Sequence, residues 1–259
     1  MRHAISGGPK LYLGRVRAGM ADYLRHKVEQ IIQISDEERR ILSDLSHTNL
    51  RSIAARRDVV REGEEPKFVH LITEGWAIRH KTLEDGRRQI IAFLLPGDLC
   101  DLNLMLMREM DHSISALTPL TVAQLPRDLF FELIEHPRLI QALTWDMMVQ
   151  AAIQREWIVS LGQRSAIERI AHLICELFLR LATIRLCIDG SCSFPITQAD
   201  LAETAGITSV HVNRVMQELR AQNLVRWNGR EVHVADMDAL KRVAMFNGNY
   251  LHGHDKPSQ

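Results

Sequence analysis

Residues 197–219 read Thr-Gln-Ala-Asp-Leu-Ala-Glu-Thr-Ala-Gly-Ile-Thr-Ser-Val-His-Val-Asn-Arg-Val-Met-Gln-Glu-Leu, and this stretch decides the fold of the C-terminal part of the chain. Leu201, Ala202 and Ala205 recur at helical spacing and would form the buried face of one short helix. Gly206 permits a tight turn, after which a second apolar set at helical spacing predicts another helix. That set is Val212, Val215, Met216 and Leu219. Two short helices joined in this way are typical of a helix-turn-helix, whose second helix lies in the DNA major groove.

A short hairpin is expected directly after these helices. Val225–Trp227 and Glu231–Val234 favour strands, and Asn228-Gly229 between them suits a type I′ turn, in which both central residues need a positive φ. A hairpin in this place would complete a winged helix. The alternative is a helical hairpin that only packs within the protein. Small residues on the first helix, the glycine turn and the polar second helix favour DNA binding over that alternative.

Residues at the start of the second helix are the candidates for reading DNA sequence. If this helix begins near Thr208 and enters the major groove, its first two turns project four side chains toward the bases. These base-reading candidates are Ser209, Val210, Asn213 and Arg214. Polar residues near the starts of both helices are expected to contact phosphates, which position the protein without reading sequence. These phosphate candidates are Thr197, Gln198, Thr208 and His211.

The charge balance requires any DNA site to be local. Lys plus Arg and Asp plus Glu number 32 each, so the whole molecule has no positive excess. Four arginines nevertheless cluster on the expected second helix and wing, where a solvated charged face is the alternative interpretation. They are Arg214, Arg220, Arg226 and Arg230. We interpret Arg39-Arg40 and Arg56-Arg57, in the N-terminal half, as solvated charges only.

The composition describes an ordinary globular protein that is long enough for two domains. Apolar residues make up 46% of the 259 residues and charged residues 25%. The longest apolar stretches, such as Ile90–Leu95, are too short to span a bilayer, so we expect a cytoplasmic protein without membrane contact. Cys100, Cys175, Cys187 and Cys192 form no CxxC pair, and no disulfide framework is expected. No catalytic set, metal-ligand cluster or phosphate loop is recognisable, which argues against an enzyme.

A long segment with helical periodicity precedes the winged helix. From Pro137 to Leu161 nothing breaks a helix, and apolar residues recur in three- and four-residue steps. The stripe consists of Ile140, Leu143, Met147, Ala151, Gln154, Ile158 and Leu161. Other faces are apolar too, so we expect this helix to pack on its own β domain and on a second copy of the chain. Gly162 interrupts the pattern before a second helix over residues 164–181, and we expect it to act as a hinge.

The region before the long helix is typical of an antiparallel β fold. Glycines recur at positions 63, 75, 86 and 97, with short β-rich runs between them. These runs are Phe68–Thr73, Trp76–Lys81 and Gln89–Leu95. Asp85-Gly86 is expected to close a hairpin as a type I′ turn. Further upstream, Ser35-Asp36-Glu37-Glu38 has the form of a capping box and predicts a helix over residues 35–47, after a flexible tail over residues 1–30.

Four short motifs lie along the chain, namely Arg61-Glu62-Gly63-Glu64, Ile72-Thr73-Glu74-Gly75, Pro96-Gly97-Asp98 and Ile196-Thr197-Gln198-Ala199-Asp200-Leu201-Ala202. With the long helix, they resemble the cyclic-AMP receptor and fumarate-nitrate regulator (Crp/Fnr) family over residues 30–245. The resemblance implies an α+β fold: a cyclic-nucleotide-binding-like antiparallel β-roll (31–136), a dimerisation helix (137–161) and a winged helix-turn-helix (162–250). It also implies a homodimer on a palindromic operator in double-stranded DNA. Contact with RNA polymerase, as an activator rather than a repressor, is implied as well.

The family pattern assigns contacts to two of the base-reading candidates. Val210 stands where relatives often have a glutamate that accepts a hydrogen bond from cytosine. Valine can offer only apolar contact, for example to a thymine methyl group. Arg214 matches a family arginine that contacts guanine. The resemblance therefore implies a half-site that differs at the base facing Val210.

The family pattern also implies where an effector would bind. In cyclic-AMP-binding members, a Gly-Glu pair contacts the ribose and an Arg-Ser pair contacts the phosphate. The matching positions here are Asp101-Leu102 and His112-Ser113. Leu102 cannot accept a ribose hydrogen bond, Asp101 would repel the phosphate, and neutral His112 replaces a bidentate arginine poorly. We therefore expect an effector other than cyclic AMP at these positions.

No cofactor is expected. The oxygen-sensing branch of the family holds an iron-sulfur centre with N-terminal cysteines, and no cysteine precedes Cys100. Haem-binding relatives leave open that His112, His80 or Cys100 ligates haem or a metal. A lone histidine in a β domain is, however, more often a hydrogen-bonded residue. Two more alternatives are redox sensing by Cys187 and Cys192, and a ligand-binding signalling module whose winged helix contacts protein instead of DNA.

Overall fold

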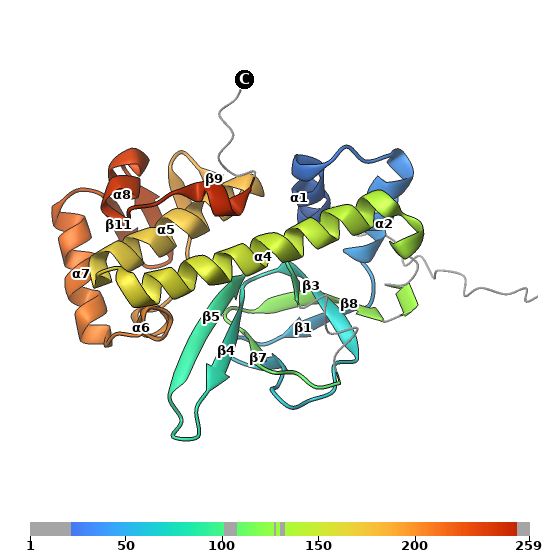
Figure 1. Cartoon of the computed structure of the whole chain (residues 1–259), viewed down its shortest axis with the longest axis horizontal. Coiled ribbons are helices and arrows are strands. Elements are labelled where there is room, and N and C mark those ends of the chain that lie inside the picture. Colours follow the sequence, from blue (N-terminus) through green and yellow to red (C-terminus); the bar gives the residue numbers. More distant parts are fainter. Residues whose placement is uncertain (1–21, 101–107, 127, 130–132, 253–259) are drawn as a thin grey trace, which may run out of the picture.

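Antiparallel strands form the N-terminal half of the chain, and helices form most of the C-terminal half (Figure 1). The computed structural model describes residues 22–100, 108–126, 128–129 and 133–252. One long helix runs across the β domain and leads into a smaller domain with helices and its own sheet. This arrangement confirms the expected α+β fold of β-roll, long helix and winged helix. None of the described helices is long and apolar enough to cross a membrane.

The β-roll consists of two four-stranded sheets with strand orders β1-β8-β3-β6 and β2-β7-β4-β5. The strands are β1 (Leu50–Ile53), β2 (Asp58–Val60), β3 (Phe68–Glu74), β4 (Ala77–Thr82), β5 (Arg88–Leu94), β6 (Leu99–Cys100), β7 (Ser113–Ala116) and β8 (Leu120–Pro126). Apolar residues from most of these strands form the interior core, because alternate residues of a strand point to the same face. Gly75 joins β3 to β4 with φ +82°, where a Cβ would lie 2.3 Å from the carbonyl oxygen of Pro119. Glycine is required at this turn.

The turn between β4 and β5 is longer than we expected. Thr82 pairs with Arg88, and the Leu83 N–H donates to the Arg87 carbonyl at 2.8 Å. Within residues 83–87, only Gly86 has a positive φ, of +85°. Residues 84–86 thus form a three-residue loop, which needs a left-handed residue only at its last position. A two-residue type I′ turn would need two left-handed residues. The type I′ prediction was therefore wrong, although the glycine does mark the hairpin.

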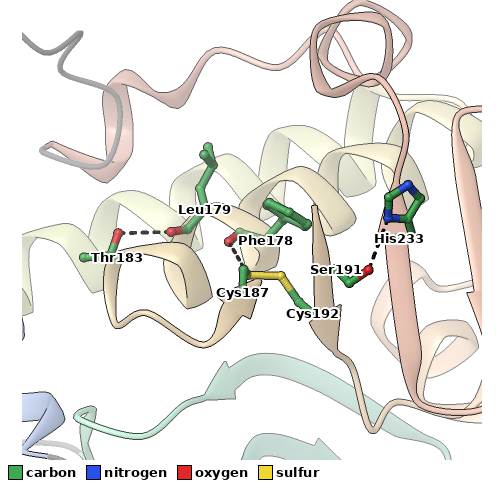
Figure 2. The surroundings of a disulfide bond; sticks show 7 residues. All are labelled: Phe178, Leu179, Thr183, Cys187, Ser191, Cys192 and His233. Carbon is green, nitrogen blue, oxygen red and sulfur yellow. Dashed lines mark hydrogen bonds between the residues drawn. A yellow bond between two sulfur atoms is a disulfide. The ribbon is translucent and has the colours of Figure 1, made fainter. Parts of the chain in front are cut away.

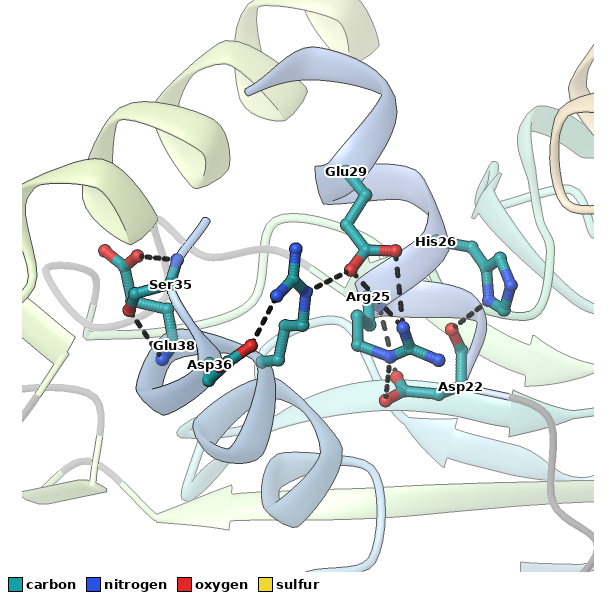
Figure 3. Close-up of polar contacts among 8 residues, drawn as sticks. Asp22, Arg25, His26, Glu29, Ser35, Asp36 and Glu38 are labelled. Atoms are coloured by element: carbon teal, nitrogen blue, oxygen red, sulfur yellow. Dashed lines mark hydrogen bonds and ion pairs between the residues drawn. The ribbon is translucent and has the colours of Figure 1, made fainter. Parts of the chain in front are cut away.

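Helix α1 (Tyr23–Ile31) occupies a segment that we expected to belong to the flexible tail. Asp22 caps the helix by accepting a hydrogen bond from the Arg25 backbone N–H at 3.1 Å (Figure 3). Leu24 and Val28, one turn apart, are buried in a core shared with the β-roll and the long helix. The tail prediction was wrong for this segment because its few apolar residues suffice once they pack against other elements. Residues 1–21 of the expected tail lie outside the described residues.

Helix α2 (Asp36–Leu45) confirms the predicted capping box. Ser35 Oγ accepts a hydrogen bond from the Glu38 N–H at 3.2 Å, and the Glu38 carboxylate accepts one from the Ser35 N–H at 2.7 Å (Figure 3). Arg39 links the two N-terminal helices, since its guanidinium donates to both Asp36 and Glu29. The cap satisfies backbone groups that would otherwise lack partners at the helix start.

The long helix α4 (Pro137–Gln163) follows a 3₁₀ turn, η2 (Leu133–Glu135), and continues through Gly162. The expected interruption of the helix at this glycine was therefore wrong. The helix ends at Arg164, whose backbone is extended (φ −82°, ψ 142°), and α5 (Ala166–Thr183) begins directly afterwards. Ser165 and Glu168 form a capping box at this start. The capping box at Ser165, rather than Gly162, marks the boundary between the two helices. A helix tolerates one glycine in its interior at a cost of about 1 kcal/mol.

The β-roll and the C-terminal domain share one continuous apolar core. The ring of Trp76 in the β-roll lies 5.9 Å from that of Phe194, and the ring of Phe93 lies 6.1 Å from that of Trp157 on α4. Phe194 also packs edge-on against Trp227 of the wing at 5.7 Å. Aromatic side chains bury large apolar areas and prefer such tilted contacts. The two domains are thus packed against each other rather than joined only by a linker.

A buried charge network adds polar contacts to this core. Lys27 Nζ on α1 lies 2.7 Å from Asp98 in the β-roll and 2.6 Å from Asp146 on α4. Arg180 on α5 lies 2.8 Å from the other oxygen of Asp98. Burial raises the pKa of the Asp98 carboxyl, but Lys27 and Arg180 outweigh this effect and hold the pKa below its ordinary value. Loss of one partner would leave a buried charge uncompensated, so the network fixes α1, the β-roll, α4 and α5 together.

The C-terminal domain contains the helix-turn-helix and the wing in the expected order, and a further helix that was not predicted follows the wing. The elements are α6 (Gln198–Ala205), α7 (Ser209–Ala221), α8 (Met237–Val243), η3 (Gly248–Leu251), β9 (Cys187–Ile188), β10 (Ser191–Ser193), β11 (Val225–Asn228) and β12 (Glu231–Val234). The wing turn lies one residue later than predicted, because Asn228 pairs with Glu231 and leaves Gly229 and Arg230 in the centre. Gly229 has φ +60°, while Arg230 is not at positive φ. A positive φ at the first central residue alone is typical of a type II′ turn.

Cys187 and Cys192 form a disulfide between β9 and β10 (Figure 2). The two residues stand directly opposite each other in the antiparallel ladder, with Cα atoms 4.5 Å apart. We expected separate thiols, because the spacing of these cysteines is not a CxxC motif; only the hairpin pairing makes them neighbours. Cys100 and Cys175 are buried and outside any disulfide. Burial raises the pKa of the Cys175 thiol to about 12, so it stays protonated and unreactive.

Reduction of the Cys187–Cys192 disulfide is expected to lower the free energy of unfolding by about 2 kcal/mol, because the closed loop is short and loop-closure entropy grows slowly with length. Urea unfolding with and without dithiothreitol measures the difference. A Cys187→Ser/Cys192→Ser double variant is the control. Its unfolding midpoint should match that of the reduced protein and should not change when dithiothreitol is added. Identical midpoints for the oxidised and reduced wild type would contradict the prediction.

Candidate nucleic-acid interface

Two side-chain caps and one left-handed glycine define the helix-turn-helix. Thr197 begins α6: its Oγ1 accepts from the Asp200 N–H at 3.2 Å, and the Asp200 carboxylate accepts from the Thr197 N–H at 2.8 Å. Gly206 ends α6 with φ +65°, a conformation that glycine adopts without steric cost. Thr208 then caps α7 by accepting from the His211 N–H at 3.2 Å. These local bonds set where each helix begins and ends.

Helix α7 presents its first two turns to solvent. Its buried face consists of Val212, Val215, Met216 and Leu219, as predicted. The four base-reading candidates, Ser209, Val210, Asn213 and Arg214, are all exposed. The exposed fraction of Val210 is 82%, so its side chain contributes little to the core of the domain. The structure brings these four side chains onto one outward surface, while their contacts with bases stay a prediction.

Two side-chain hydrogen bonds organise this outward surface. Arg214 Nη2 lies 3.0 Å from His211 Nε2, and Gln217 Nε2 donates to Asn213 Oδ1 at 2.9 Å. A guanidinium has only donors, so the histidine nitrogen is the acceptor. His211, which we predicted as a phosphate contact, therefore also lies beside the base-reading candidate Arg214. Gln217, which the sequence did not single out, stands next to Asn213 because residues four apart share a helix face.

The other phosphate candidates are exposed at the helix starts, but they differ in their free hydrogen-bonding capacity. The Thr197 hydroxyl donates its one proton to Asp200 at 2.6 Å, so it cannot donate to a phosphate at the same time. The Thr208 hydroxyl acts as an acceptor in its cap and can still donate. Gln198 occupies the first position of α6, where a helix N-terminus favours anions. Gln198 and Thr208 are therefore the better placed of these three for a phosphate.

Arg56 of the β-roll forms a bidentate ion pair with Asp200 on α6. Its Nη1 and Nη2 atoms lie 2.6 Å and 2.9 Å from the two carboxylate oxygens. Our interpretation of Arg56 as a solvated charge was therefore wrong. Burial raises the pKa of Asp200, but hydrogen bonds from Arg56 and Thr197 outweigh this effect and hold the pKa below its ordinary value. The same carboxylate thus caps α6 and holds it to the β-roll.

Two further contacts join β5 to α6. Arg88 Nε lies 2.7 Å from Glu203 Oε2, and Gln89 Nε2 donates to the Thr204 carbonyl at 3.0 Å. Glu203 and Thr204 follow Asp200 by three and four residues, so the three positions share one face of the helix. The β-roll therefore holds the first helix of the helix-turn-helix at three points, and this contact sets the direction in which α7 faces.

An Arg56→Ala substitution is expected to lower the free energy of unfolding by about 1–2 kcal/mol at pH 7, because it leaves the buried Asp200 without its main cation. The loss is smaller than for a fully buried pair, since the exposed fraction of the Arg56 side chain is 45%. Arg57→Ala, which removes the neighbouring exposed guanidinium, is the matched control and should change stability little. Urea unfolding of the three proteins measures these differences.

The effect of Arg56→Ala should also depend on pH. The folded-state pKa of Asp200 is depressed, so the ion pair stabilises fully above the unfolded-state value of about 4 and is lost as the pH falls through the folded-state value. The difference in the free energy of unfolding between wild type and Arg56→Ala should therefore become smaller at acidic pH. If this difference is the same at pH 7 and at the lowest pH where the protein stays folded, the stabilising role of the Arg56–Asp200 ion pair is contradicted.

The expected effector position is described only in part. Asp101 and Leu102 lie outside the described residues. His112 Nδ1 lies 2.7 Å from Asp111 Oδ1, and Ser113 Oγ accepts a hydrogen bond from a backbone N–H of the loop after β2. The imidazole is thus held beside the carboxylate of the neighbouring residue, Asp111.

Arg79 is a buried cation of the β-roll that the sequence analysis missed. Its exposed fraction is 5%, and it lies on β4 two residues after Ala77, which belongs to the interior core. Alternate residues of a strand share a face, so Arg79 is directed toward the interior of the roll. The sequence signal that could have found it is that Arg79 falls on an inward-facing position of the predicted strand Trp76–Lys81. Arg79 is therefore an additional candidate for contact with an effector inside the β-roll.

Two of the suggested haem or metal ligands, His80 and Cys100, lie on strands of the β-roll. His80 Nε2 lies 2.7 Å from Ser115 Oγ, which donates in turn to Asp58 at 2.8 Å. Burial lowers the pKa of His80, and the positive charge of Arg88 adds to this effect. Cys100 is buried in β6. Among the residues that the structure describes, no group of three or more His, Cys, Asp or Glu side chains could hold a metal ion.

Comparison with known proteins matches both halves of the chain. Residues 50–136 match the cyclic nucleotide-binding domain family, and residues 168–243 match the Crp-like helix-turn-helix domain family. A probable transcriptional activator of Rhizobium leguminosarum bv. viciae is 30% identical over 199 residues, which cover 76% of this chain and 82% of the relative. The transcriptional activator protein FnrL of Cereibacter sphaeroides is also 30% identical over 199 residues, with 75% and 79% covered.

A solved structure supports the same architecture. FixK2 from Bradyrhizobium japonicum superposes with a TM-score of 0.67 at 23% identity, covering 75% of this chain and 96% of that protein. At this identity the likeness concerns the fold alone. The matches to both domains, together with relatives that are 30% identical over most of their length, establish the family. The chain belongs to the Crp/Fnr family of transcription regulators and carries that family's DNA-binding helix-turn-helix.

Proposed function

We propose that this protein is a homodimeric regulator that reads a palindromic operator through α7. The observation that carries the proposal is the outward surface of α7, where four side chains suited to base contacts are exposed on a helix whose other face is buried. The relatives' names as transcriptional activators support activation, with contact to RNA polymerase, as the mode of action. The protein is proposed to act without haem, so its purified form should show no Soret absorption band.

A second copy of the chain is the partner that α4 fits best. One face of α4 packs on its own subunit and includes Leu143, a member of the predicted apolar stripe. The opposite face leaves Met147, Ala151, Gln154, Ile158 and Leu161 exposed, in alternating steps of four and three residues. This is the heptad spacing of helices that pack lengthwise. A two-fold pair through this stripe would present two α7 helices to successive major grooves.

Cyclic AMP is expected neither to bind tightly nor to change operator affinity. Where family members that bind it have a phosphate-contacting arginine, this chain has His112, and Asp111 adds a negative charge beside it. Isothermal titration of the full chain with micromolar cyclic AMP should give no saturable heat. Micromolar binding with a parallel gain in operator affinity would show that the pocket is wrongly assigned.

A gel-retardation experiment with the full chain tests the proposed function. We expect selection of specific duplexes from a random pool and a steep loss of affinity with salt, because lysine and arginine contacts with phosphates release counterions. Absence of DNA retention at low salt would contradict the proposal and favour a signalling module whose winged helix contacts protein.

A further inference from the structure

A cleft of about 470 Å³ lies between the β-roll and the winged helix. One wall belongs to the β-roll and includes Arg56, Leu117 and Thr118. The other wall is formed by the start of α6, the second half of α7 and the turn of the wing. Sites for small ligands have volumes of about 300–1,000 Å³. The cleft therefore has room for a group that touches both domains at once.

Three guanidinium groups line this cleft, and no carboxylate is among its described lining residues. Arg56 is neutralised by Asp200. Arg220 and Arg230, by contrast, are exposed and have neither an ion pair nor a side-chain hydrogen bond within the described part of the chain. Positive charges that line one cleft without nearby negative charges create a positive potential, and this potential concentrates anions in the cleft. The cleft is thus suited to a negatively charged group.

The remaining lining narrows the chemistry of that group. Ile196, Leu201 and Met216 contribute apolar surface, and Trp227 contributes an aromatic ring. Guanidinium groups match the oxygens of a phosphate with paired N–H donors, which a compact halide cannot use. We propose that this cleft is a phosphate-binding site, in which Arg220 and Arg230 hold the phosphate between the wing and the β-roll.

Two sources carry this phosphate chemistry. Gln198, a predicted phosphate contact, lines the same cleft, so the backbone of bound DNA would extend the interface from the helix-turn-helix toward the β-roll. A free organic phosphate would instead bridge the two domains and place its apolar part against Trp227. The DNA source rests on the proposed function, whereas the free phosphate does not.

Titration of the full chain with inorganic pyrophosphate tests the site. We expect saturable binding to the wild type and roughly fivefold weaker binding for Arg220→Gln or Arg230→Gln, since each removes charged hydrogen bonds. Arg226→Gln is the matched control, because Arg226 is an exposed arginine of the same wing that does not line the cleft. It should bind pyrophosphate like the wild type. Absence of saturable binding, or an equal loss in all three variants, would overturn the proposal.

Competition with operator DNA then identifies the source. If the DNA backbone supplies the phosphate, DNA should displace pyrophosphate, and each cleft substitution should reduce the salt slope of DNA binding by about 0.9. If a free organic phosphate is the ligand, DNA and pyrophosphate should bind together, and the slope should not change. Either result supports the site. Pyrophosphate binding by a protein that retains no DNA would contradict the proposed function alone, so the two failures are distinguishable.

Discussion

An Ile158→Asp substitution should convert the dimer into a monomer and weaken operator binding on the order of 100-fold or more, because the second half-site contact is then lost. The exposed fraction of Ile158 is 69% in the single chain, so the change should leave the subunit folded. In a two-fold pair the substitution acts twice and places two carboxylates in an apolar seam. Light scattering at micromolar concentration measures the mass, and gel retardation measures the affinity.

Ile188→Asp is the matched control for Ile158→Asp. Ile188 has an exposed fraction of 74% and lies on β9, so it is not part of the stripe of α4, and its replacement tests the general effect of an added surface charge. This variant should remain dimeric and bind the operator like the wild type. An Ile158→Asp protein with the mass of a dimer and unchanged affinity would show that α4 is not the interface.

Arg214→Ala should weaken operator binding and relax its specificity at one base pair. A bidentate arginine contact with guanine contributes about 1–3 kcal/mol of discrimination, which corresponds to roughly 5- to 150-fold in relative affinity. Arg214 is exposed on α7, and His211 holds its guanidinium at 3.0 Å without burying it. Selection of binding sites from a random pool, with wild type and variant side by side, should show loss of preference at a single position in each half-site.

Val210→Glu should instead create a preference for cytosine at one position of each half-site. The glutamate would replace an exposed valine one helical turn before Arg214 and could accept a hydrogen bond from the amino group of cytosine. Arg226→Ala, which removes an exposed arginine of the wing, is the control and should leave the selected half-site unchanged. Identical half-site preferences for wild type, Arg214→Ala and Val210→Glu would mean that α7 does not read the sequence.

Local sequence signals predicted the helix-turn-helix and the start of α2 correctly because the interactions behind them span only a few residues. The capping residue Ser35 was identifiable from Glu38, three positions away, and the buried face of α7 followed from its helical period. Turn geometry was less accessible. Gly86 and Gly229 marked their hairpins, but the register of the flanking strands, which local sequence does not encode, decided the turn types.

Contacts between distant segments were decided by the tertiary structure alone. Arg56 carried no sign of its partner Asp200, which lies 144 residues away, and Cys187 and Cys192 became neighbours only through the pairing of β9 with β10. Helix α1 likewise depends on a core that other elements complete. The sequence by itself determined the order of the elements and which residues of α7 face outward, because helix periods and caps are local. The packing of the β-roll against α6 required the folded chain, because burial and ion pairing depend on which distant surfaces meet.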